Sequence, residues 1–239
     1  MCTVSTSLSD SAFVVTMNRD ELRSRLEGPL YSEETHCYPT DQSAGGTWCG
    51  INQHGLIFCL LNRYDAPVST DNSIVSRGGI IPVLLACSDI ESVNKRINSL
   101  SFESYNGFRL LVLSALHCEQ HDWDRAQYSV TTLKLPGDVF SSSSSVNSMQ
   151  FPKQREQRYR RWQQSQLAPI SFGHIPSIHL LEPSVAPNES IFMVREKTHT
   201  KSVCQFAVQD EKVSLNYWPA QNGFIHENVQ HWSVPYVKR

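Results

Sequence analysis

The start of the chain carries two β-favouring runs, residues 3–8 and 12–17, on either side of a polar Ser-Asp-Ser turn. Two such runs around a turn cluster predict a β-hairpin. A turn at this point makes the numbers of facing residues add up to about 20 or 21, because antiparallel partners are counted outward from the turn. The register therefore predicts that Asn18 or Arg19 lies directly across from Cys2, and this pairing constrains the fold more than any other segment.

A second hairpin is predicted for residues 47–52 and 56–62, because Gly55 supplies the turn between them. The polar stretch between the two hairpins contains Pro29 and Pro39 and is predicted to be a loop.

Helices are predicted in the middle of the chain, with further strands around them. Three helices are expected. The first begins near Pro82, the second covers residues 88–100 with Ser88 and Glu91 in capping-box spacing, and the third covers residues 149–166. The expected strands cover residues 108–115, 127–133, 190–195, 202–208 and 213–218. Strands at both ends with helices between them predict an α+β layered architecture, and nothing marks a boundary within residues 1–239, so a single domain is expected.

Composition excludes several classes of protein. The 239 residues carry a net charge of −2, which disfavours nucleic acid as a partner. No apolar run approaches the ~18 residues of a membrane span, and no secretory signal opens the chain, so a cytoplasmic location is expected. The seven cysteines show no CxxC pair, which argues for reduced core thiols rather than a disulfide framework.

Cys2 is a candidate nucleophile. If Met1 is removed, the exposed α-amine, with an ordinary pKa of about 7.7 to 8.0, can act as the base for the thiol of the same residue. A guanidinium from Arg19 would favour the thiolate, and Asp20 could hold the amine through a charge-assisted hydrogen bond. The plainer alternative is a buried small residue beside a solvated Asn-Arg-Asp-Glu strand end.

Several motifs together resemble the NRDE family, also called the transport and Golgi organisation protein 2 family. They are Cys2 before a hairpin that ends in Asn18-Arg19-Asp20-Glu21, the segment GTWCGIN at 46–52, Asn62-Arg63, and Ser76-Arg77-Gly78. This family in turn is similar to the N-terminal-nucleophile (Ntn) hydrolases of the bile-salt-hydrolase and penicillin-acylase kind. The resemblance implies a four-layer αββα fold with two stacked antiparallel sheets.

The same resemblance implies a reaction, the cleavage of a non-peptide C–N bond through an acyl-Cys2 intermediate. Arg19 would steady the thiolate or a substrate oxygen, Asp20 would orient the α-amine, and Asn62 would donate to the oxyanion. No cofactor is required for this hydrolysis.

Four further residues are expected to contact the substrate: Asn18, Trp48, Asn147 and Lys201. Related hydrolases carry another Asn in mid-chain and an Arg near the C-terminal strands. Residues 142–145 or Asn147 are the candidates for the first, and Lys201 for the second. Lysine keeps the charge but lacks the bidentate fork of arginine.

A non-enzymatic carrier is the alternative, because relatives have been linked to the handling of haem or of acyl-CoA and other lipids. Haem is then a possible bound ligand, although no spacing identifies an axial ligand. His117 and His121 are spaced for a metal on a helix, but no third ligand is evident. The basic segment at 153–162 is expected to be a solvated helix face. The oligomeric state stays open.

Overall fold

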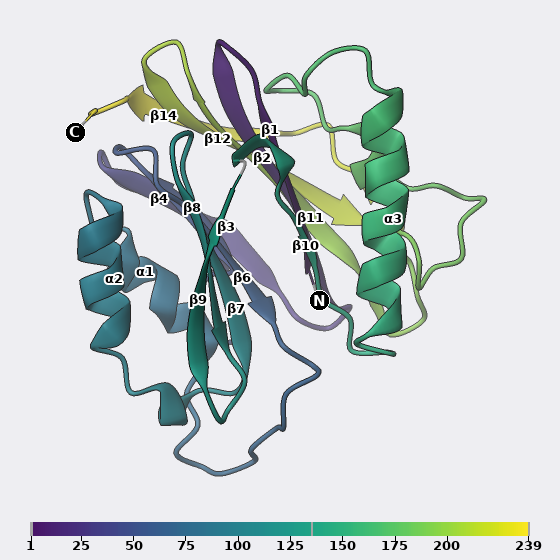
Figure 1. Cartoon of the computed structure of the whole chain (residues 1–239). Helices are drawn as coiled ribbons and strands as arrows, with labels where there is room; N and C mark the ends of the chain where they lie inside the picture. The colour runs from purple at the N-terminus through teal and green to yellow at the C-terminus, as the bar shows by residue number, and fades with distance from the viewer. Residues whose placement is uncertain (1, 135, 239) are drawn as a thin grey trace.

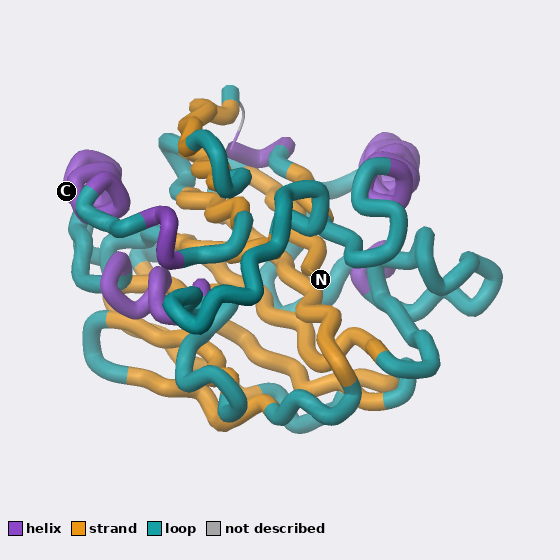
Figure 2. The backbone as a smooth tube through the Cα atoms, turned by 90° about the horizontal axis from the view of Figure 1, so that it is seen from below, coloured by secondary structure: helices purple, strands orange, loops and turns teal. Residues whose placement is uncertain are grey.

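The computed structural model describes residues 2–134 and 136–238. These residues form two antiparallel sheets of seven strands each, stacked face to face, with helices on the outer faces (Figure 1). Seen from below in Figure 2, the strands occupy the middle of the molecule and the N-terminus lies near the centre of this end. The predicted α+β architecture of four layers, αββα, is confirmed.

The first sheet has the order β10-β1-β2-β11-β12-β13, with β14 also paired to β12. Its strands are β1 (Cys2–Leu8), β2 (Ala12–Leu22), β10 (Phe140–Ser142), β11 (Thr198–Gln209), β12 (Lys212–Gln221), β13 (Phe224–Ile225) and β14 (Gln230–Pro235). The hairpin of β1 and β2 has the predicted register, because Cys2 pairs with Arg19. Two far-separated parts of the chain, β10 and β11, flank this hairpin.

The second sheet runs in chain order. Its strands are β3 (Glu27–Ser32), β4 (His36–Asp41), β5 (Cys49–Asn52), β6 (Ile57–Asn62), β7 (Phe108–Leu113), β8 (Cys118–Trp123) and β9 (Tyr128–Leu133). The second predicted hairpin is confirmed as β5 and β6, and Gly55 at its turn has a φ of +69°. A left-handed φ of this kind suits glycine because it has no Cβ.

The predicted polar loop between the hairpins is wrong, because it forms β3 and β4. Pro29 is tolerated because β3 is the edge of its sheet. Pro39 pairs with Leu30 on β3 but lies beyond the stretch of β4 that pairs with β5, which consists of His36 and Cys37. Neither proline therefore has to donate a central ladder hydrogen bond.

The α-helices of the described chain are α1 (Ile80–Leu84), α2 (Ile90–Asn98) and α3 (Gln150–Ser165). Short 3₁₀ turns cover Arg77–Gly79, Phe102–Ser104, Pro136–Asp138 and Ser177–His179. Helices α1 and α2 cover the second sheet, and α3 covers the first (Figure 1). The capping box of α2 is formed by Asp89 and Ser92, one residue later than predicted. No helix in the described chain is long and apolar enough to cross a membrane.

In the second half of the chain one sequence expectation fails, and one strand was not predicted. The strand at 127–133 exists, but it pairs with the unpredicted β8, whose mainly polar sequence gives no apolar run. The expected strand at 190–195 is absent apart from a single bridge between Val194 and His199. The buried residues there pack as an irregular segment under β11 instead of adding to the sheet.

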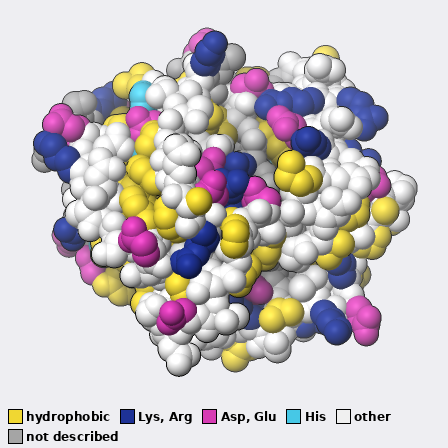
Figure 3. Space-filling view, turned by 60° about the horizontal axis from the view of Figure 1, so that its bottom comes forward, with side chains coloured by type: hydrophobic (Ala, Val, Ile, Leu, Met, Phe, Trp, Pro, Cys, Tyr) yellow, Lys and Arg dark blue, Asp and Glu magenta, His cyan; other side chains and the backbone are white. Residues whose placement is uncertain are grey.

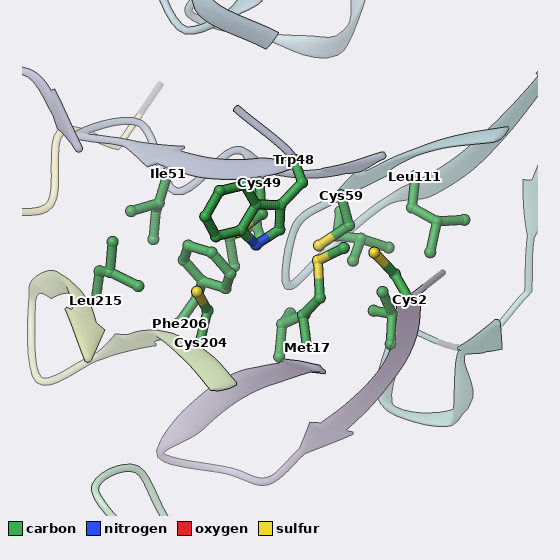
Figure 4. Packing of buried hydrophobic residues seen from close by; sticks show 14 of the residues in the cluster. Cys2, Met17, Trp48, Cys49, Ile51, Cys59, Leu111, Cys204, Phe206 and Leu215 are labelled. Atoms are coloured by element: carbon green, nitrogen blue, oxygen red, sulfur yellow. The ribbon is translucent and has the colours of Figure 1, made fainter. Parts of the chain in front are cut away.

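The core between the sheets contains a layer of sulfur. Cys49 pairs with Cys59 across β5 and β6, and Met17 pairs with Cys204 across β2 and β11. Figure 4 shows the sulfur atoms of Cys2 and Cys59 turned toward that of Met17. The described cysteines are all free thiols, as the sequence predicts. Packing between the sheets thus holds the Cys2 side chain from one side.

Candidate active site

Cys2 is the first residue of β1, and its side chain faces the space between the sheets with 7% of the residue exposed. Its backbone N–H donates to Ser143 Oγ at 3.1 Å, and the N–H of Ser143 donates to the Cys2 carbonyl at 3.0 Å. These bonds continue the pairing of β1 with β10 by one residue. The backbone nitrogen of Cys2 is thereby held in a fixed direction.

Arg19 lies opposite Cys2 and is buried, with 3% of the residue exposed. Its Nη1 donates to Glu27 Oε1 at 2.6 Å, and its Nη2 donates to Asp41 Oδ2. The guanidinium also lies 4.0 Å from the centre of the Trp48 ring, within the range of a cation–π contact. Because β3 and β4 supply both carboxylates, Arg19 ties the first sheet to the second at the Cys2 end.

The pKa of the Cys2 thiol is raised to about 11, chiefly by burial and further by the nearby Asp20 carboxylate. Arg19 acts in the opposite direction, as expected from the sequence, but its charge is shared with two carboxylates. The expected net lowering of this pKa is therefore wrong, because desolvation outweighs the guanidinium. The thiol is protonated at neutral pH.

Asp20 lies on the other face of β2, where it is fully buried. Thr200 Oγ1 donates to Asp20 Oδ1 at 2.6 Å. Burial raises the pKa of Asp20, and the positive charges of Arg155 and Arg195 oppose this rise. A buried carboxylate near two arginines thus lies within electrostatic reach of Cys2.

A small cavity of about 90 Å³ opens beside the Cys2 side chain. Four predicted site residues line it together: Cys2, Arg19, Trp48 and Asn62. Asn62 ends β6, and its Nδ2 donates to Tyr64 Oη at 3.1 Å. Figure 3 turns this end toward the viewer and shows acidic and basic side chains next to each other near the middle of the face.

A larger cavity of about 290 Å³ lies on the other side of Asn62. Its lining includes the serines at 141–144, Arg109 and residues at the start of α3. Asn62 therefore stands between the two cavities and faces both.

Three predicted substrate contacts are not brought to these cavities. Asn18 has its side chain on the opposite face of β2 from Arg19, where it is buried and bonded to His179. Asn147 is exposed at the turn before α3, and its Oδ1 accepts from the N–H of Gln150. Lys201 lies at a register shift in β11, and its Nζ donates to the Arg23 carbonyl.

Sequence reasoning missed Arg155 and did not single out Ser143 among its candidates at 142–145. Arg155 lies in the basic segment expected to be solvated, yet it is fully buried. Its Nη1 donates to Ser142 Oγ and to the Ser143 carbonyl, both at 3.1 Å, and its Nη2 donates to the Asn188 carbonyl at 3.0 Å. Arg155 thus supports the segment that holds Cys2. Only the serines at 142–145 gave a signal in the sequence, since they were candidates for the missing mid-chain Asn.

The predicted histidine pair lies on β8 and its preceding turn, not on a helix. His117 Nε2 lies 2.8 Å from Glu119 Oε1, and His121 Nε2 lies 3.3 Å from Glu119 Oε2. Within residues 2–134 and 136–238, no group of three or more His, Cys, Asp or Glu side chains is arranged to hold a metal ion.

Comparison with known proteins places this site in context. A family model described as Transport and Golgi organisation 2 matches residues 1–169. No curated protein matches the chain. Among solved structures, an N-acylethanolamine-hydrolyzing acid amidase orthologue from Caenorhabditis elegans is similar with a TM-score of 0.53 at 9% identity, covering 86% of this chain and 92% of that one.

A second similar structure is the C2A mutant of conjugated bile acid hydrolase from Clostridium perfringens. It has a TM-score of 0.51 at 9% identity and covers 97% of this chain and 96% of that one. At this identity the likeness concerns the fold, which is that of the Ntn hydrolases, as the sequence predicts.

Proposed function

The chain belongs to the Transport and Golgi organisation 2 family, and on that premise we propose that it is an N-terminal-cysteine hydrolase or acyl-transfer enzyme. Its substrate in this proposal is a small non-peptide amide or another acyl compound. The observation that carries the proposal is the shared cavity, in which the Cys2 side chain, the Arg19 guanidinium and Asn62 meet.

The reaction begins with removal of Met1, which lies outside the described residues. The freed α-amine of Cys2 takes the thiol proton while Sγ forms a bond to the substrate carbonyl carbon. Electrons of the carbonyl double bond move to oxygen, and Asn62 donates to the oxyanion. Collapse of this intermediate breaks the C–N bond, and the leaving amine takes the proton from the α-ammonium. Water then attacks the acyl-Cys2 and regenerates the thiol.

A protonated resting thiol is compatible with this mechanism. The base is an amine of the same residue, so proton transfer accompanies the attack and no free thiolate has to accumulate. Ser143 Oγ, 3.1 Å from the Cys2 nitrogen, would direct that amine. Asp20 would stabilise its ammonium form, since its carboxylate interacts electrostatically with Cys2.

The test combines intact mass with turnover. Protein without Met1 is assayed against a panel of small amides and thioesters, and acyl-enzyme is sought by mass spectrometry after quenching. Cys2→Ser should abolish both turnover and the acyl adduct, whereas the control Cys59→Ser, which changes another buried thiol beside Cys2, should retain both. An adduct on a cysteine other than Cys2 would contradict the proposal.

A second candidate function is a carrier of haem or an acyl-CoA. The pairing of Arg19 with two carboxylates favours it, because an arginine neutralised in this way has less charge to offer a thiolate. The carrier proposal expects stoichiometric binding of haem or acyl-CoA by protein that retains Met1, measured by absorbance or calorimetric titration. The carrier proposal would be excluded if the purified protein bound less than one equivalent of haem or acyl-CoA and also showed turnover that depends on Cys2.

A further inference from the structure

Arg77 belongs to a loop that is locked against the Cys2 cavity. The N–H of Thr47 donates to the Gly78 carbonyl at 3.0 Å. A Cβ on Gly46 would come within 2.5 Å of the Gly78 carbonyl carbon, so glycine at position 46 permits an approach that a larger residue would block. The two motifs GTWCG and SRG are therefore parts of one structure, and Arg77 lines the cavity beside Cys2.

The guanidinium of Arg77 is held by a neutral partner. Its Nη1 donates to the Gly107 carbonyl at 2.7 Å. The other two arginines of the cavity are paired with carboxylates, Arg19 with Glu27 and Asp41, and Arg25 with Asp41. In the part of the chain that the structure describes, no carboxylate lies within 4.0 Å of Arg77. Among the described residues, one of its five N–H groups has an acceptor, so the others are open to a ligand.

Partial burial of Arg77 adds to the difference between it and the two arginines that are paired with carboxylates. Burial lowers the pKa of Arg77, Arg25 lowers it further, and Tyr64 and the cavity-lining Glu21 act to raise it. A partly buried cation without a carboxylate gains more from an anion than an exposed one, because the effective dielectric constant is lower. The cavity would therefore favour a negative group at this position.

We propose that the compound that reaches Cys2 carries a carboxylate or phosphate group, and that Arg77 binds this group at the cavity. The cavity of about 90 Å³ admits a small anionic group and leaves the remainder of the compound outside. The inference deepens the proposed function by naming the class of substrate, and it rests on that function only for the role of Cys2.

The charge preference is measurable without knowing the substrate. Iodoacetate and iodoacetamide form the same bond to a thiol and differ mainly in one negative charge. The ratio of their rate constants at Cys2, iodoacetate to iodoacetamide, is obtained by peptide mass spectrometry. Arg77→Gln should lower this ratio by roughly 5-fold or more, because it removes a cation without a carboxylate partner from the cavity that Arg77 and Cys2 both line.

Arg96→Gln is the matched control. It removes the same charge from the last turn of α2, at an exposed residue outside the cavity lining, and should leave the ratio unchanged. Equal ratios in the wild type and Arg77→Gln would overturn the inference. Thermal melting of each variant confirms that it is folded, and Arg77→Lys, which keeps the charge, should retain most of the ratio.

A second measurement decides the matter if Cys2 is too buried to alkylate. Acetate and inorganic phosphate, each compared with chloride at equal ionic strength, should raise the melting temperature of the wild type and not of Arg77→Gln. The anion that stabilises more identifies the source of the charge, and no stabilisation by either overturns the inference. Turnover that survives Cys2→Ser would instead refute the hydrolase function and leave these results valid for Arg77.

Discussion

Replacing Arg19 by Met tests whether the ion pairs at the Cys2 end hold the two sheets together. Methionine approximates the length of the arginine stem and removes the charge. The side chains of Arg19, Glu27 and Asp41 are 4%, 8% and 7% exposed. The substitution therefore leaves two buried carboxylates without their shared guanidinium, which is the costly way to break a buried pair.

The remaining partners set the expected magnitude. Asp41 keeps Arg25, whose Nε lies 2.7 Å from Oδ2. Among the described residues, Glu27 keeps two neutral donors, Tyr217 Oη at 2.7 Å and Ser202 Oγ at 3.1 Å. Because one of the two carboxylates stays paired, we expect the lower end of the usual range for breaking a buried pair, about 3 kcal/mol of the free energy of unfolding. For a chain of this size that is a fall in melting temperature of roughly 6–12 °C.

The assay is urea unfolding at pH 7 followed by far-ultraviolet circular dichroism. Tryptophan fluorescence is avoided because Trp48 contacts the guanidinium directly. Adding Glu27→Gln to Arg19→Met should recover at least about 1 kcal/mol, since the amide removes the unpaired charge. The control is Arg158→Met, whose pair with Glu182 is 25% and 33% exposed and is expected to contribute at most ~1 kcal/mol.

A loss below about 1 kcal/mol in Arg19→Met, equal to that of the control, would refute the reasoning. It would mean that water or local rearrangement compensates the carboxylates. A double variant less stable than Arg19→Met would equally contradict it, because Glu27 would then contribute through its shape or its neutral donors rather than through its unpaired charge.

Two further predictions concern packing and pH. Gly46→Ala should lower the free energy of unfolding by ~1–3 kcal/mol and slow the alkylation of Cys2, because its Cβ would displace the loop of Arg77. Gly79→Ala is the control, because there is open space around its Cβ, and it should change neither quantity. Equal effects of the two variants in urea unfolding would disprove the locked loop. His179 is fully buried, and burial lowers its pKa to about 3, so stability present above pH ~6.5 should decline as the pH falls toward 3. His179→Gln should flatten this acid dependence, and an unchanged slope between pH 6 and 4 would show that other groups dominate.

Local pattern was sufficient for the parts of the site that lie close together in the chain. The turn and the alternation of β1 and β2 fix the pairing of Cys2 with Arg19, because a hairpin register depends only on residues between its own ends. The same reasoning located β6, which ends at Asn62. The wrong expectation for the pKa of Cys2 shows the limit: the partner was identified, but its two carboxylates and the depth of burial were not.

Residues distant in the chain could be placed only by the tertiary structure. Ser143 reaches the Cys2 nitrogen across a separation of 141 residues, and nothing in a serine run says which strand it will meet. Arg155 looks like any arginine of a polar helix, yet α3 lies on the first sheet so that this one side chain is buried against the Ser143 segment.

The sequence by itself thus determined the two hairpins, the layered fold and the thiol–guanidinium pair, because turns and side-chain alternation act between neighbours along the chain. The tertiary structure decided which charges are neutralised, which arginine of the cavity stays without a carboxylate, and which polar groups direct the Cys2 nitrogen. These properties depend on distances between sheets, and on the water that packing excludes, and neither is encoded in any one segment.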